Sequence, residues 1–173
     1  SGGGEFYGKA KPLLDRLYIN KGNSDFDKFT LPNYFENASI VLDFDLDQDG
    51  DLDVFVGSHV DGLNFGELPN SYVLINEKDH FTLKQIEKLG MVTNAITTDF
   101  NNDRQTDIIV VGEWMHPTFL QNNNGDFKDM TSTYLKENLN GLWQSIATFD
   151  IDNDGDEDYI LGNFGLNSKF KAS

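Results

Sequence analysis

The chain has 173 residues, 38% of them hydrophobic and 13% aromatic, and a formal net charge of −16. This apolar content predicts a folded body and excludes a disordered acidic tail. The negative charge excludes nucleic acid as the expected partner, because phosphates repel such a surface, and favours cations. The absence of cysteine excludes disulfides and thiolate metal sites. Neither a leader pattern nor an apolar run of about 18 residues occurs, so we expect no direct membrane insertion and any address signal to lie elsewhere.

Short β-prone runs follow one another from the N-terminus, and three acidic segments interrupt them. The first acidic loop is D-L-D-Q-D-G-D-L-D at residues 45–53, the second is D-F-N-N-D-R-Q-T-D at residues 99–107, and the third is D-I-D-N-D-G-D-E-D at residues 150–158. Their starts are 54 and 51 residues apart. A period of roughly 50 residues is typical of propeller blades and solenoid units, which stack on a shared core.

The flanks of the acidic loops repeat as well. A β-prone run precedes each loop, at residues 40–44, 95–98 and 146–149, and a run closed by glycine follows it, at residues 54–57, 108–112 and 159–162. A third kind of run ends in asparagine and is followed by a phenylalanine, at residues 17–26, 72–81 and 118–127. Such runs predict strand and hairpin meanders, and Phe26, Phe81 and Phe127 are predicted core residues. Residues 83–89 and 131–140 are predicted short helical turns.

These strands predict an all-β fold of four-stranded antiparallel β-propeller blades. We expect one propeller segment over residues 1–173: the end of one blade at residues 1–32, whole blades at 38–87 and 93–131, and the start of a further blade at 142–173. The opening glycines fit the end of a missing strand. Because closed propellers have four to eight blades, we expect both termini to lie inside blades of a longer propeller.

Each acidic loop has the composition of a calcium site. Calcium takes six to eight oxygen ligands, which alternate residues of a short loop can supply, and a glycine at the bend takes a positive φ. The seventh loop residue is expected to offer its backbone carbonyl. The predicted ligands are Asp45, Asp47, Asp49, Asp51 and Asp53 in the first loop, Asp99, Asn101, Asp103, Gln105 and Asp107 in the second, and Asp150, Asp152, Asp154, Asp156 and Asp158 in the third.

The second loop departs from this pattern at its bend. Arg104 stands where the other two loops have Gly50 and Gly155. A non-glycine residue there costs about 1 kcal/mol of strain, and a guanidinium weakens the attraction for a cation. We therefore predict two strong Ca²⁺ sites and a weaker one, and whether the second loop binds calcium stays open.

A calcium hairpin has two alternatives. An EF-hand requires a glutamate at its twelfth position and an outgoing helix, whereas the twelfth positions here are Val56, Val110 and Leu161, inside apolar β runs. Metal-free Asp and Gly turns are the alternative for any single loop. Three loops at a fixed spacing favour the metal, because carboxylates packed this densely repel one another without a cation.

With this pattern in view, the sequence resembles the FG-GAP/VCBS repeats of integrin α-subunit propellers and bacterial surface proteins over nearly its whole length. The runs at residues 15–20, 112–115 and 162–168 are similar to bacterial proteins that pair such repeats with an ASPIC/UnbV domain, relatives of cartilage acidic protein. The resemblance implies a seven- or eight-bladed propeller with calcium in the hairpins between the first two strands of each blade. It also implies adhesion or ligand binding on the opposite face, but it does not imply an enzymatic activity.

Few residues suggest catalysis or direct ligand contact. Three histidines occupy unrelated positions of the repeat, with no nucleophile and acid recurring beside them, so we interpret them as surface or loop residues and expect no enzyme: His59, His80 and His116. Trp114 and Trp143 lie in or near loops that a propeller gathers at one end. They are candidate ligand contacts, and packing between blades is the alternative.

Together these features favour a calcium-binding module that recognises a protein or a glycan outside the cell, at an outer membrane or at a cell surface. Extracellular calcium is abundant enough to fill such sites. An alternative is part of a propeller-fold polysaccharide lyase or hydrolase, which requires basic, tyrosine or histidine side chains converging on a face away from the loops. Self-association through exposed blade edges is a further expectation.

Overall fold

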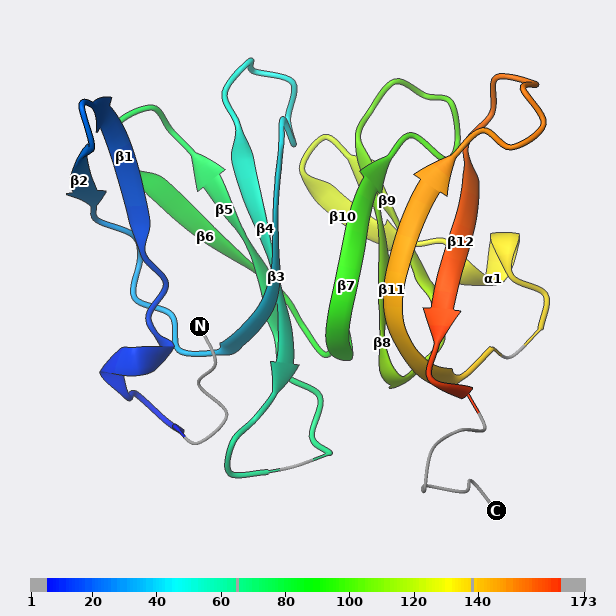
Figure 1. Ribbon diagram of the computed structural model, residues 1–173, viewed down its shortest axis with the longest axis horizontal. Coiled ribbons are helices and arrows are strands. Elements are labelled where there is room, and N and C mark those ends of the chain that lie inside the picture. The colour runs from blue at the N-terminus through cyan, green and yellow to red at the C-terminus, as the bar shows by residue number, and fades with distance from the viewer. Residues whose placement is uncertain (1–5, 65, 138, 166–173) are drawn as a thin grey trace.

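The structure, a computed structural model, describes residues 6–64, 66–137 and 139–165 (Figure 1). These residues form twelve β-strands, one four-residue α-helix and one 3₁₀ turn. All strand pairings among them are antiparallel. The all-β fold class predicted from the sequence is therefore confirmed.

Two four-stranded meanders form the centre of the described chain. The first blade has the order β3-β4-β5-β6, with β3 (Asn37–Phe44), β4 (Asp53–Val60), β5 (Ser71–Asn76) and β6 (Phe81–Ile86). The second blade has the same order in β7 (Met91–Thr98), β8 (Asp107–Met115), β9 (Thr118–Asn123) and β10 (Asp126–Asp129). This repetition of a meander is what the repeated strand and turn signals predict.

Strand pairs flank the two blades on either side. The 3₁₀ turn η1 (Lys11–Leu13) precedes the hairpin of β1 (Leu17–Gly22) and β2 (Asp25–Phe29). The helix α1 (Thr131–Tyr134) leads into the hairpin of β11 (Gly141–Phe149) and β12 (Asp158–Asn163). The opening glycines assigned to a missing strand, and residues 166–173 of the last predicted segment, lie outside the described residues.

The start of β11 also pairs with the end of β8, which the sequence did not predict. Gly141 lies opposite Met115 and Leu142 opposite Glu113, with an irregularity in register between the two pairs. Because of this short ladder, β7 to β12 form one six-stranded sheet. The second blade is thereby joined to the next strand pair by backbone pairing as well as by side-chain packing.

The apolar core lies between neighbouring sheets. Phe44 and Phe55 of the first blade meet Val92, Ile108 and other side chains of the second. A second cluster packs Ile109 and other residues of the second blade against Ile146 and its neighbours on β11 and β12. Because β8 is covered on both faces, its residues 108–111 are fully buried. This explains why the run is continuously apolar instead of alternating.

Glycine and a hydroxyl set the distance between blades. A Cβ on Gly57 of β4 would lie 2.7 Å from Cγ1 of Val92 in the second blade, so only glycine permits this approach. The hydroxyl of Ser39 lies 2.6 Å from the carbonyl oxygen of Val92. Thr93 repeats this contact one blade further, 2.7 Å from the carbonyl oxygen of Trp143. The inner strands are therefore joined by polar contacts at equivalent places.

Two expectations from the sequence are wrong. Residues 83–89 were predicted as a helical turn, but residues 83–86 belong to β6, whose pairing with β5 overrides a weak local signal. Phe26 was predicted as core, but its side chain is 55% exposed on the β1–β2 hairpin. Phe81 and Phe127 are half-buried against the apolar clusters. In the described part of the chain, no helix is long and apolar enough to cross a bilayer.

Candidate metal centre

The three acidic loops join β3 to β4, β7 to β8 and β11 to β12, and all three lie along the upper edge of the view in Figure 1. They share one backbone path. Their sixth residues have positive φ values of 91° at Gly50, 69° at Arg104 and 93° at Gly155. The sequence predicted this bend. Their fourth residues also have positive φ, between 58° and 62°, which the sequence did not reveal: Gln48, Asn102 and Asn153.

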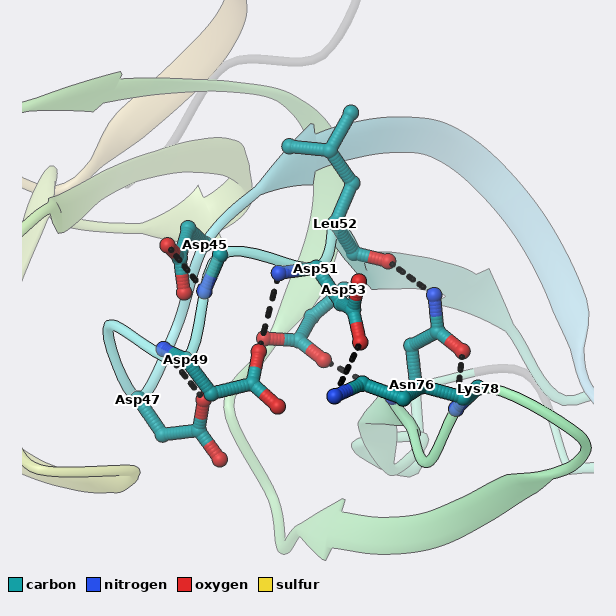
Figure 2. Close-up of polar contacts among 9 residues, drawn as sticks. Asp45, Asp47, Asp49, Asp51, Leu52, Asp53, Asn76 and Lys78 are labelled. Carbon is teal, nitrogen blue, oxygen red and sulfur yellow. Dashed lines mark hydrogen bonds and ion pairs between the residues drawn. The ribbon is translucent and has the colours of Figure 1, made fainter.

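Backbone amides of each loop donate hydrogen bonds to the loop's own acidic side chains. Figure 2 shows this for the first loop, where the amide of Asp49 donates to Asp47 at 3.3 Å and that of Asp51 to Asp49 at 2.9 Å. The amide of Gly50 donates to Asp45 at 3.1 Å. The third loop repeats the corresponding bonds at Asp154, Asp156 and Gly155. The alternating acids therefore all turn toward the interior of the loop, where they fix its path.

The ninth residue of each loop closes it from the first position of the following strand. Asp53 is 1% exposed and accepts hydrogen bonds from the amides of Leu46 at 2.7 Å and Asn76 at 2.8 Å. Burial raises the pKa of Asp53, and these two bonds oppose the rise. In the third loop Asp158 accepts the corresponding bond from Ile151 at 2.9 Å. The closing aspartate thus ties the loop to the blade.

Asp107 closes the second loop in the same way. It is fully buried and accepts a 2.8 Å hydrogen bond from the amide of Asn122. Burial raises the pKa of Asp107 to about 6, with the carboxylates of Asp103 and Asp99 adding to the rise and the amide of Asn122 opposing it. A cation beside a carboxyl in this environment would stabilise its ionised form and so take the place of the proton.

The first and third loops bring carboxylate oxygens close together. One oxygen each from Asp45, Asp47 and Asp49 lies within 4.8 Å of the others, and the same holds for one group in the third loop: Asp150, Asp152 and Asp158. Oδ1 of Asp45 is buried and accepts no hydrogen bond in the described structure. A set of oxygen donors around such an oxygen fits a hard cation such as calcium.

The remaining predicted ligands occupy the second half of each loop. Asp51, whose carbonyl was predicted to bind, has its side chain 3.9 Å from the ammonium of Lys78. Gln105, at the same place in the second loop, accepts a hydrogen bond from the amide of Asn124 at 2.9 Å. Asp154 and Asp156 of the third loop are exposed. In the first and second loops, this half therefore also contacts the turn that follows the third strand of the blade.

The second loop presents a different donor set. Its carboxylates do not form a group as close as those of the other two loops within the described structure. Amide groups of Asn101 and Gln121 donate to Asp103 at 3.0 and 3.3 Å. The hydrogen bond from the amide of Gln105 holds the pKa of Asp103 below its usual value. Asp103 is therefore already engaged by protein donors.

Two asparagines at or next to the ends of the third strands belong to the site, although no role was predicted for them. Asn76 and Asn122 each donate a backbone hydrogen bond to a closing aspartate, and their side chains make further bonds around the loops. Their recurrence in each such run is the sequence signal that could have identified them. Glu157 was also missed, and it accepts a hydrogen bond from Thr98 of the second blade.

The other candidate residues lie apart from the acidic loops. Trp114, near the end of β8, is 56% exposed with a φ of 60°. Trp143 is half-buried, donates to the carbonyl of Leu139 at 2.9 Å and packs in the cluster between β8 and β12. Each histidine lies on a different element or turn: His59 on β4, 3.5 Å from Glu113, His80 beside Asp79 before β6, and His116 after β8.

A family model for the FG-GAP-like repeat matches residues 99–161. This segment runs from the second acidic loop through β8, β9, β10, α1 and β11 into β12, and so contains two of the three loops. The match confirms the FG-GAP part of the sequence resemblance for this segment. Searches of curated proteins and of solved structures found no match.

Proposed function

We propose that this chain is a calcium-stabilised β-propeller module that recognises a protein or a glycan outside the cell or at a cell surface, with no catalytic activity of its own. The observation that carries the proposal is the repeated loop path with two close groups of carboxylate oxygens. The kinship with ASPIC/UnbV-associated proteins and cartilage acidic protein belongs to this proposal and is supported by the sequence resemblance alone.

Asp45, Asp47 and Asp49 would hold one ion, and Asp150, Asp152 and Asp158 another. A bound calcium ion supplies positive charge among carboxylates that otherwise repel one another. Because these carboxylates come together only in the folded hairpin, calcium binding stabilises the fold by mass action, by about 2.7 kcal/mol at a hundredfold excess over Kd. Extracellular calcium then acts as a structural component of the recognition module.

The test is a calcium titration of the chelator-stripped protein by isothermal titration calorimetry, together with its melting temperature. We expect two or three sites and a marked rise in Tm at millimolar calcium. Asp47→Ala with Asp152→Ala should abolish the strong sites. Asp43→Ala removes one exposed charge from β3 beside the first loop and should leave binding intact. The absence of binding at millimolar calcium would overturn the proposal.

Recognition is tested separately, with calcium present throughout. A glycan array and a search for bound surface proteins with the calcium-loaded chain should give a partner whose binding is lost when calcium is removed. Turnover of a polysaccharide by the same preparation would instead support the lyase or hydrolase alternative.

A further inference from the structure

The first and second acidic loops are connected through a single buried side chain. Asn122, at the end of β9 in the second blade, is fully buried. Its side-chain amide donates a 2.7 Å hydrogen bond to the carbonyl oxygen of Leu46, in the first loop. Leu46 lies between Asp45 and Asp47, two of the three residues whose oxygens form the close group of that loop. Asn122 therefore holds the backbone that carries these two side chains.

The same residue also holds the second loop. The backbone amide of Asn122 donates to Oδ1 of Asp107, the closing aspartate, at 2.8 Å. Its side-chain oxygen accepts a 2.9 Å hydrogen bond from the amide of Gly125, which fixes the orientation of the amide group. From Leu46 to Asp107, the path consists of one residue and two hydrogen bonds. Both loops are therefore hydrogen-bonded to the same residue.

A second, exposed contact runs beside this path. The side chain of Gln48 in the first loop donates a 2.8 Å hydrogen bond to the carbonyl oxygen of Arg104 in the second. Gln48 and Arg104 both have positive φ, so the contact joins a bend of the first loop to a bend of the second. The loops are linked at a buried and at an exposed place.

Asn76 occupies the equivalent position in the first blade, and its contacts are local. Its backbone amide donates to Asp53 at 2.8 Å, as that of Asn122 does to Asp107. Its side chain, however, donates to the carbonyl oxygen of Leu52 at 3.2 Å and accepts from the amide of Lys78 at 3.0 Å. Both partners lie in its own blade, so Asn76 provides a natural comparison for the cross-blade role.

We propose that Asn122 is a positioning residue that couples the first and second acidic loops, so that a calcium ion in one loop raises the affinity of the other. The inference depends on the proposed function, since it concerns the same calcium loops. An ion in the first loop orders residues 45–47 and with them the carbonyl that Asn122 binds. The second loop then binds its calcium ion with Asp107 already oriented. The conformational entropy lost on ordering the two loops is therefore lost once and not twice. Linkage requires that the effect be reciprocal.

The experiment uses the full chain with Asp152→Ala, which removes the third loop from the titration. Calorimetry first gives the calcium affinity of the second loop when the first is filled. Asp47→Ala then disables the first loop, and the affinity of the second is measured alone. We expect the second loop to bind at least about fivefold more weakly in the absence of the first ion. As an independent readout, the amide NMR signals of Arg104 and Gln105 should shift when only the first loop fills.

Asn122→Ala should abolish this difference, whereas the matched control Asn76→Ala should preserve it. If Asn122→Ala fails to fold, the comparison with and without Asp47→Ala still tests the coupling. The exposed variant Gln48→Ala should then reduce the ratio between the two calcium affinities of the second loop without affecting folding. Equal affinities of the second loop with and without the first ion would overturn the coupling and leave calcium binding intact. If no variant shows a heat of calcium binding, the proposed function is overturned, and the coupling with it.

Discussion

The first and second acidic loops follow one backbone path and offer a cation different chemistry. Both turn through positive φ at their fourth and sixth residues, and both close on a buried aspartate held by the amide of a strand-ending asparagine. The first brings three carboxylates together, whereas in the second the amides of Asn101 and Gln121 donate to Asp103. Strand pairing and the closing aspartate therefore accompany the same loop path in both, while the residues between them decide how many carboxylate oxygens come together.

Replacing a closing aspartate is expected to have the largest effect on the free energy of unfolding. Asp53→Ala leaves the buried amides of Leu46 and Asn76 without their acceptor. An unsatisfied buried donor costs about 1–3 kcal/mol. We expect Asp53→Ala to lower the free energy of unfolding by about 3 kcal/mol in a chelator, where no ion contributes, and Asp107→Ala, which frees the one buried amide of Asn122, to lower it by about 1–2 kcal/mol. Urea denaturation measures both.

Asp49→Ala is the matched control for these variants. It removes a carboxylate of the same loop that is exposed and accepts one amide hydrogen bond. In a chelator we expect its cost to be below about 1 kcal/mol, whereas with calcium it should weaken binding. If Asp53→Ala is no more destabilising than Asp49→Ala without calcium, the closing aspartate does not set the loop path.

A pH effect of intermediate size is expected from the closing aspartate of the second loop. Burial raises the pKa of Asp107 to about 6, from an ordinary value of 3.8. The folded state then holds this proton more tightly than the unfolded state, so the stability it contributes is complete below about pH 4 and is lost as the pH rises through about 6. We expect a loss of about 1–2 kcal/mol over this window in a chelator, because solvent near the exposed loop screens part of the desolvation.

Denaturation measured from pH 4 to 7 checks whether stability falls as the pH rises. The profile of Asp107→Asn should be flatter than that of the unaltered chain. With saturating calcium the trend should reverse, because the ion binds the ionised carboxyl and competes with the proton. A profile in a chelator that keeps its slope after Asp107→Asn would exclude Asp107 as the cause.

The sequence was sufficient to predict the meanders and the loops, because both depend on local chemistry that repeats. Strand runs, the glycine at the bend of residues 45–53 and the alternation of aspartates can all be recognised within one repeat. The strand assignments succeed because buried β runs such as residues 108–111 are apolar on both faces, a pattern that turn residues interrupt on each side.

What the sequence could not predict depends on contacts between repeats. The side chain of Asn122 reaches Leu46, 76 residues away along the chain, and no local pattern encodes that distance. The exposure of Phe26 also depends on such contacts. Its place in the repeat matches that of two half-buried phenylalanines, so the local sequence alone predicts the same burial for all three. The ladder between β8 and β11 likewise depends on how neighbouring strands converge. In each case the missing information is which surface the neighbouring blade covers.

The smallest expected effect tests the residue that most clearly distinguishes the second loop from the first. Arg104 has a φ of 69°, a conformation that costs an L-residue about 1 kcal/mol and that glycine adopts freely. Arg104→Gly keeps the carbonyl that accepts the hydrogen bond from Gln48 and removes both the strain and the positive charge. We expect it to raise the free energy of unfolding in a chelator by about 0.5–1 kcal/mol and to tighten calcium binding by the second loop.

Gly50→Arg is the reverse change in the first loop. No atom lies within 4 Å of where a Cβ on Gly50 would stand, so the substitution introduces strain and charge without a clash. It should destabilise the chain by a similar amount, about 0.5–1 kcal/mol, and weaken the first calcium site. If both substitutions leave calcium affinity unchanged, the bend residue does not distinguish the loops. The difference between them would then be due to Asn101 and the amide donors that surround Asp103.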